Sequence, residues 1–296
     1  MIHLKPFFAV VFTLLFFNFH AYSASGIGFE ISYHQVDSLK YDVDFVVYRY
    51  CGSVKLNTNF TTPYMVCQTS GYKKSLDWKI VSVQEIKTEC DSIGGPCNPP
   101  NASFGGNGYE RIVLRSTVDL TLSKFDSFYN NGCTSIRFEM EDCCRNSAST
   151  VGLGNTKMYT YAEVNLDIDG GNSSPSFTSP PILYGCCNQP VYYNVGAIDA
   201  DDDSLSYALA EPLSAYGTGL KYAGSYAYNR PIDCYLPGSL KFPYNNPNAN
   251  PPIGLHVNEK TGDLIFTPIK CDEYTTLVME VTEWRKDTST GKMAKV

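Results

Sequence analysis

Histidine is scarce in this chain, and the local motifs of common hydrolases are absent. Four of the 296 residues are histidines, and beyond residue 23 these are His34 and His256. Neither lies in an HExxH helix or beside a G-x-S-x-G nucleophile turn. The acidic residues Glu139, Glu141 and Asp142 share one strand, which does not suit a glycosidase carboxylate pair. We therefore expect a protein that is not an enzyme, and a secreted hydrolase is the second alternative function.

Positive charge and long apolar runs are also limited. Charged residues make up 18% of the chain, the net charge is −7, and no basic stripe is visible. A nucleic-acid ligand calls for a clustered positive surface, so this class of partner is not expected. After residue 23, no apolar run approaches the ~20 residues of a membrane-spanning helix. The sequence predicts no transmembrane segment in the mature chain.

Residues 1–23 have the pattern of a secretory signal peptide. Lys5 provides the positive charge, residues 6–19 form the apolar segment, and small residues up to Ser23 form a cleavage site before Ala24. The apolar segment is too short for a membrane anchor. We therefore expect an exported protein that is secreted or held at the cell surface.

The remaining chain has the pattern of β-structure. It contains 23 glycines and 17 prolines, while amphipathic helical periodicity is hard to find. Apolar and polar residues alternate with a period of two in several stretches, including 40–50, 110–122 and 158–165. A length of 296 residues suggests two domains. We predict an all-β protein with tandem β-sandwich domains at 24–170 and 171–296, the second truncated at its last strand.

Eleven cysteines in an exported chain predict disulfides and not a zinc site. Cys90 and Cys97 enclose a short loop and are the one pair that the spacing suggests. On a strand, neighbouring side chains point to opposite faces, so each adjacent cysteine pair should direct one sulfur inward and one outward. The odd count leaves one thiol without a partner in this chain. The pairing stays open for Cys51, Cys67, Cys133, Cys143, Cys144, Cys186, Cys187, Cys234 and Cys271.

The stretch 196–209, GAIDADDDSLSYAL, concentrates carboxylates on a turn. Four aspartates fall within five residues, and Leu205, Tyr207 and Leu209 then alternate as in a half-buried strand. Crowded oxygen ligands suit calcium, which takes six to eight of them. A solvated acidic turn that needs no ion is the alternative interpretation.

Three pieces of the chain resemble cadherin repeats. The stretch 166–177, LDIDGGNSSPSF, resembles the Asp- and Asn-rich junction between repeats, and the acidic turn resembles the Asp-Ala-Asp turn that follows it. Residues 256–268 resemble the Thr-Gly hairpin of cadherin-like and bacterial immunoglobulin-like domains. The resemblance implies immunoglobulin-like or cadherin-like sandwiches with calcium at the junction. Its candidate ligands are Asp167, Asp169, Asp199, Asp201 and Asp203.

Residues 214–254 are rich in tyrosine, glycine, asparagine and proline and show no strand pattern. A loop of this length tends to be functional. Rigid, amphipathic tyrosines are enriched at recognition sites, so a glycan-binding module is the first alternative function. Packing of the loop on its own sandwich is the competing interpretation, and Cys234 is expected to tether it. The candidate binding residues are Tyr216, Tyr222, Tyr226 and Tyr228.

A further series of motifs covers nearly the whole mature chain. They are VYRYCG (47–52), STVDL (116–120), DCCRNSA (142–148), YAEVNL with NSSPSF (161–177), the acidic turn, TGDLIFTP (261–268) and VTEWRKD (281–287). In these motifs the chain is similar to the N-terminal region of large Bacteroidota surface proteins, described as gliding motility-associated or PKD- or cadherin-like and exported by type IX secretion. The WDFGDG motif of PKD domains and a C-terminal sorting domain do not occur in these residues. The resemblance implies a non-catalytic structural or adhesion protein whose partners are other surface proteins or extracellular glycans.

Overall fold

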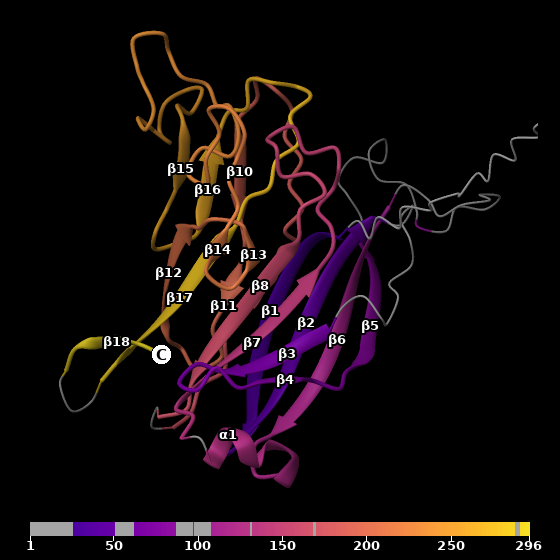
Figure 1. The fold of residues 1–296 in the computed structure, drawn as a ribbon. Coiled ribbons are helices and arrows are strands. Elements are labelled where there is room, and N and C mark those ends of the chain that lie inside the picture. Colours follow the sequence, from indigo (N-terminus) through magenta and orange to yellow (C-terminus); the bar gives the residue numbers. More distant parts are fainter. Residues whose placement is uncertain are drawn as a thin grey trace, which may run out of the picture.

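The described structure, a computed structural model, is almost entirely β-structure, which confirms the predicted all-β class (Figure 1). It describes residues 26–50, 62–86, 97, 108–130, 132–167, 170–287 and 291–296. Two short helical segments, η1 (Ser123–Phe125) and α1 (Asp126–Asn130), follow one another. Over these ranges, no helix has both the length and the apolar character needed to cross a membrane.

Two antiparallel sheets contain the strands of the first half, and two short strands of the second half, β13 and β14, join one of them. One has the strand order β1-β2-β6-β5, and the other has the order β14-β13-β8-β7-β3-β4. The strands of the first sheet are β1 (Gly26–Asp37), β2 (Lys40–Tyr50), β6 (Tyr109–Asp119) and β5 (Lys79–Ile86). The strands of the second are β14 (Thr218–Gly219), β13 (Leu213–Ala215), β8 (Met158–Asn165), β7 (Ser135–Asp142), β3 (Thr62–Cys67) and β4 (Lys73–Ser75).

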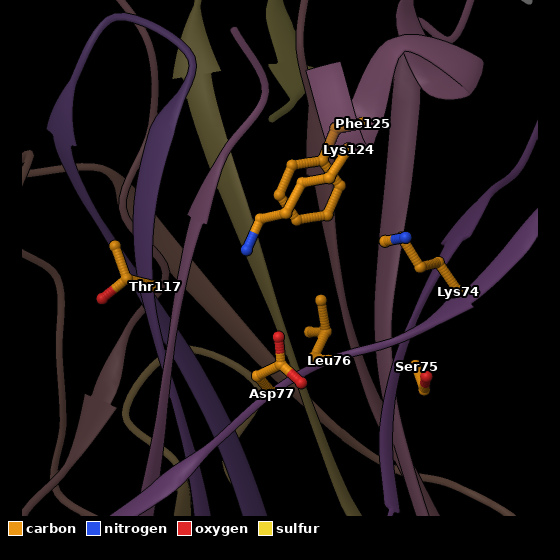
Figure 2. Close-up of a pocket in the computed structure, with 7 residues that line it drawn as sticks. All are labelled: Lys74, Ser75, Leu76, Asp77, Thr117, Lys124 and Phe125. Atoms are coloured by element: carbon orange, nitrogen blue, oxygen red, sulfur yellow. The ribbon is translucent and has the colours of Figure 1, made fainter. Parts of the chain in front are cut away.

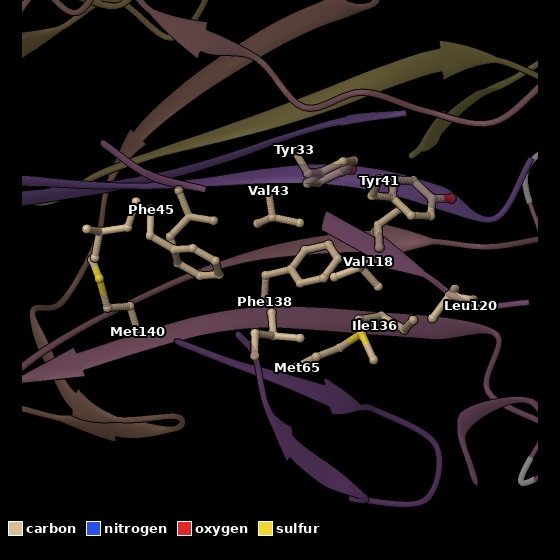
Figure 3. Packing of buried hydrophobic residues seen from close by; sticks show 14 of the residues in the cluster. Tyr33, Tyr41, Val43, Phe45, Met65, Val118, Leu120, Ile136, Phe138 and Met140 are labelled. Atoms are coloured by element: carbon tan, nitrogen blue, oxygen red, sulfur yellow. The ribbon is translucent and has the colours of Figure 1, made fainter. Parts of the chain in front are cut away.

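Apolar residues at alternate positions form the core between these two sheets. Val43 and Phe45 of β2 are fully buried, as are Phe138 and Met140 of β7. Figure 3 shows these side chains meeting in one cluster. Each buried side chain of this size contributes about 1.5–3 kcal/mol relative to exposure. The period-two pattern therefore places Phe138 and Met140 of β7 in the core, and the residues that alternate with them point to the opposite face of the sheet.

The second half is built from short strands in smaller sheets. Val191, Leu264 and Phe266 form its apolar cluster. The three-stranded sheet around this cluster is β10 (Val191–Asn194), β16 (Asp263–Phe266) and β15 (Leu255–Val257). A two-stranded sheet pairs β9 (Ser176–Phe177) with β11 (Ala197–Ile198). A third sheet contains β12 (Ser204–Leu209), β17 (Met279–Lys286) and β18 (Met293–Lys295).

The two halves are not linked by residues 166–175 alone. Strand β13 joins β8 through the pair Leu213–Tyr159, so the second half extends a sheet of the first. The guanidinium of Arg145 strengthens this contact, since its Nη2 donates to the Leu213 carbonyl at 3.2 Å and its Nη1 to the Thr156 hydroxyl at 3.2 Å. The predicted division near residue 170 stays a prediction, and the contacts of β13 cross it.

The disulfides of the described residues fix several connections. Cys67 bonds to Cys133, and Cys187 bonds to Cys271. Cys143 and Cys144 bond to each other, so their sulfurs do not point to opposite faces as expected. The physical reason is that β7 ends at Asp142, so the alternation rule of strands does not apply to this pair.

Two thiols among the described residues are free, the exposed Cys186 and the half-buried Cys234. Burial raises the pKa of the Cys234 thiol to about 12. The expected disulfide tether at Cys234 is therefore wrong, and the loop is held there by backbone pairing of Cys234 with Pro268. Cys97 is buried and disulfide-bonded. Cys51 and Cys90 lie outside the described residues, so the Cys90–Cys97 pair stays a prediction.

Candidate functional site

The acidic turn between β11 and β12 folds around Asp199. Its Oδ1 accepts hydrogen bonds from the backbone N–H of Asp201 at 2.9 Å and of Asp203 at 2.8 Å. Asp202 has a φ of 60°, a left-handed conformation that aspartate tolerates better than most residues. Carboxylate oxygens of Asp199, Asp203 and Glu283 lie within 4.8 Å of one another. We call these three residues the acidic cluster.

Glu283 reaches the acidic cluster from β17. It lies opposite Leu205 of β12 in the antiparallel pair and is 7% exposed. Burial, reinforced by the nearby carboxylates of Asp199 and Asp203, raises the pKa of Glu283 to about 8. Glu283 is therefore mostly protonated at neutral pH in the absence of a cation.

Arg285, two residues further along β17, supplies a cation beside the acidic cluster. Its Nε and Nη2 donate to the two carboxylate oxygens of Asp203 at 2.8 and 2.7 Å. Its remaining donors reach the Gly171 carbonyl and the Asn172 Oδ1, both at 2.7 Å. The hydrogen bond to Asp203 raises the pKa of Arg285. This side chain thus ties the linker to the acidic turn.

The linker residues 172–174 also bond to the first half. The Asn172 Nδ2 donates to the Tyr33 hydroxyl and to the Glu283 Oε1, each at 3.1 Å. Ser174 exchanges hydrogen bonds with the backbone of Tyr33 on β1 at 2.8 Å. The backbone N–H of Ser173 donates to the Asp201 Oδ2 at 2.6 Å. Residues 172–174 therefore contact β1 on one side and the acidic turn on the other.

The five predicted ligands do not all meet at this place. Asp199 and Asp203 come together, and Asp201 lies beside them, 3.7 Å from the Arg285 Nη2. Asp167 is exposed and does not belong to the acidic cluster; its backbone N–H bonds to the Asn165 side chain. Asp169 lies outside the described residues.

Sequence reasoning missed Glu283, Asn172 and Arg285. The sequence did contain one signal for Glu283. It alternates with Met279 and Val281 along β17, so it lies on the same, less exposed face of the strand. A glutamate on that face indicates a buried carboxylate that needs a partner.

The acidic cluster has the donor chemistry that calcium requires. The Asp199 Oδ2 is buried and receives no hydrogen bond from a backbone N–H or from Arg285; the protonated carboxyl of Glu283 is its neighbour when no cation is bound. Each oxygen of Asp203 keeps a free lone pair after accepting from Arg285, because a carboxylate offers about four acceptor positions. Calcium takes six to eight oxygens and tolerates irregular geometry. The three side chains fit a calcium ion whose remaining ligands are carbonyl oxygens or water.

The four tyrosines predicted for binding do not share one surface. The Tyr222 hydroxyl donates to the Thr276 carbonyl at 2.7 Å. The Tyr226 hydroxyl donates to Glu273 and accepts from the Lys270 Nζ. Both side chains are half-buried, and their hydroxyls bond to residues of the second half of the chain. Tyr216 and Tyr228 are exposed, by 50% and 38%.

A small pocket of about 180 Å³ lies apart from these groups, near β4 and η1 (Figure 2). Its lining contains no histidine or cysteine. The ammonium groups of Lys74 and Lys124 lie 5.7 and 5.1 Å from the centre of the Phe125 ring. Phe125 is only 2% exposed, so a ligand has little of that ring to contact. The lining residues are Lys74, Ser75, Leu76, Asp77, Thr117, Lys124 and Phe125.

Comparisons with known proteins found no match to this chain. They covered protein-family models, curated proteins and solved structures. The likeness to gliding-associated surface proteins therefore depends on the sequence motifs quoted above. The functional proposal therefore uses this likeness together with the geometry of the junction at residues 171–174.

Proposed function

We propose that this protein is a non-catalytic secreted or cell-surface structural or adhesion protein, part of a larger surface protein linked to gliding or adhesion. The observation that carries the proposal is the junction at residues 171–174. Its polar groups bond to β1 of the first half and to the acidic turn and β17 of the second. A surface protein that holds and presents other modules requires such a fixed joint between its parts.

Calcium at the acidic cluster is part of this proposal. Without a cation, burial and the neighbouring carboxylates of Asp199 and Asp203 raise the pKa of Glu283 and keep it protonated. A calcium ion neutralises them and stabilises the turn against which the linker packs. The role of the ion is structural. It stabilises the acidic turn, and Arg285 and Asn172 join that turn to the linker.

Export supports the same proposal. The disulfides Cys67–Cys133 and Cys187–Cys271 are typical of proteins that fold in an oxidising compartment. The predicted signal peptide leads to such a compartment, and the motif resemblance adds type IX secretion and the cell surface as the final location.

Millimolar calcium is expected to raise the melting temperature of the protein by about 5 °C or more, because an ion that binds only the folded state stabilises it. The measurement is thermal unfolding by circular dichroism in calcium and in EGTA. Asp199→Asn is expected to remove most of the response, since it takes one of the three carboxylates from the acidic cluster. Asp167→Asn is the matched control and keeps the response. Superimposable curves in calcium and EGTA for the unmodified chain would contradict the calcium proposal.

A further inference from the structure

The outer face of the six-stranded sheet carries an ordered array of aromatic and charged side chains. On β7, Ile136, Phe138 and Met140 point into the core. The residues between them, Arg137 and Glu139, therefore point to the opposite face. Both are nonetheless buried, at 7% and 3% exposure, because neighbouring side chains on the same face cover them.

Glu139 is the centre of this array. Its carboxylate accepts from the Lys73 Nζ at 2.5 Å, from the Arg137 Nε at 3.3 Å and from the Tyr159 hydroxyl. The Lys73 ammonium also lies 3.9 Å from the centre of the Tyr64 ring. Lys73 and Arg137 thus pair with Glu139 within the face, and these contacts hold the side chains beneath Tyr216 in place.

Tyr216 lies on top of these side chains. Its ring centre is 3.4 Å from the Arg137 guanidinium carbon, so the guanidinium covers one side of the ring. Tyr161 contacts the Tyr216 ring edge-to-face, with ring centres 5.5 Å apart. The Tyr216 hydroxyl donates to the Glu163 Oε1 at 3.5 Å. Tyr216 is still 50% exposed and Tyr161 38% exposed. The ring is held in place before any ligand arrives, which lowers the entropy cost of binding.

We propose that this face binds a neutral polysaccharide, with Tyr216 as the ring on which a sugar stacks. The apolar C–H face of a pyranose packs on an aromatic ring. The Glu163 carboxylate, which lies at the Tyr216 hydroxyl, is placed to accept hydrogen bonds from sugar hydroxyls. The inference is independent of the calcium-dependent structural role and uses different residues.

The charge balance of the face favours a neutral ligand over an anionic one. Two cations, Lys73 and Arg137, stand against three carboxylates on the neighbouring strand positions, and most of these charges pair with one another. Both cations pair with Glu139, so a polyanion would find no unpaired positive charge on this face. Among the described residues of β3, β7 and β8, the exposed large apolar side chain is the aromatic Tyr161, and none is aliphatic.

Native gel electrophoresis of the full chain in gels containing hydroxyethylcellulose, laminarin or galactomannan tests the proposal. The chain carries a net charge of −7 and migrates to the anode, so binding to an uncharged polymer slows it. We expect retardation in at least one of these gels. Tyr216→Ala is expected to weaken binding by about tenfold or more, as for an aromatic anchor, and Tyr216→Phe to keep it within about threefold. Tyr228→Ala, another exposed tyrosine outside this face, is the matched control and keeps full binding.

Three results would overturn the proposal. They are the absence of retardation in all three neutral gels, undiminished retardation of Tyr216→Ala, and retardation only in gels with cationic chitosan or anionic dextran sulfate. If circular dichroism shows Tyr216→Ala to be poorly folded, Tyr161→Ala decides, with a loss of binding expected in the same gels. Repeating the gels in EGTA separates this site from calcium, because binding to the sheet face is expected to persist there.

Discussion

Replacing Arg285 with methionine is expected to lower the free energy of unfolding by about 3–5 kcal/mol, as for the loss of one partner of a buried ion pair. The Asp203 side chain is 4% exposed and would keep its charge without the guanidinium that neutralises it. Methionine retains most of the apolar stem of arginine, so the loss is mainly electrostatic and hydrogen-bonding. Urea denaturation in EGTA, followed by tryptophan fluorescence, measures the change.

Arg115→Met is the matched control for this substitution. Arg115 also donates to both oxygens of one aspartate, Asp44, at 2.6 and 2.7 Å. Its side chain is 39% exposed and that of Asp44 is 23% exposed, so water screens the pair. The expected loss is below about 1 kcal/mol. Calcium should restore part of the stability of Arg285→Met and none of that of Arg115→Met; equal small losses in the two variants would show that burial of Asp203 has no special cost.

The second large effect is a pH dependence caused by Glu283. Its pKa is about 8 in the folded protein, against 4.5 for an unperturbed glutamate. Between these values the folded state holds a proton that the unfolded state has lost, so the free energy of unfolding falls as pH rises. Below pH 4.5 and above pH 8 this contribution is constant. The expected total decline is on the order of a few kcal/mol in EGTA, measured by urea denaturation at a series of pH values.

Glu283→Gln is expected to remove the decline between pH 7 and 8. Glu30 provides the comparison, because burial raises its pKa to about 7 and its own contribution ends there. Glu30→Gln should therefore flatten only the lower part of the profile. Calcium should flatten the upper part in the unmodified chain, since the ion binds the charged form of Glu283. A profile that is the same for Glu283→Gln and the unmodified chain would contradict the assignment.

Strands such as β2 and β7 were predictable because their signal is local, whereas β3 was not predicted. In β2 and β7 the apolar residues recur at every second position, and the structure buries that set in one core. The vicinal pair Cys143–Cys144 was not predictable in this way. It lies just beyond the end of β7, where strand alternation no longer determines the direction of side chains.

The candidate site was predictable only where its residues are close in the chain. Asp199 and Asp203 share a turn, so the sequence placed them together. Glu283 and Arg285 join them through the pairing of β17 with β12, a long-range register that no local pattern specifies. The same limit applies to Tyr216, whose position over Arg137 depends on the pairing of β13 with β8.

The burial of Asn172 has a consequence for producing the protein. Asn172 is followed by Ser173 and Ser174, which makes an acceptor sequence for N-linked glycosylation in eukaryotic hosts. The nitrogen that would carry the sugar is the Nδ2 that bonds to Tyr33 and Glu283, and the residue is 2% exposed. A eukaryotic secretory pathway attaches such sugars before folding is complete, so Asn172 could no longer occupy its place. Expression in bacteria avoids that modification.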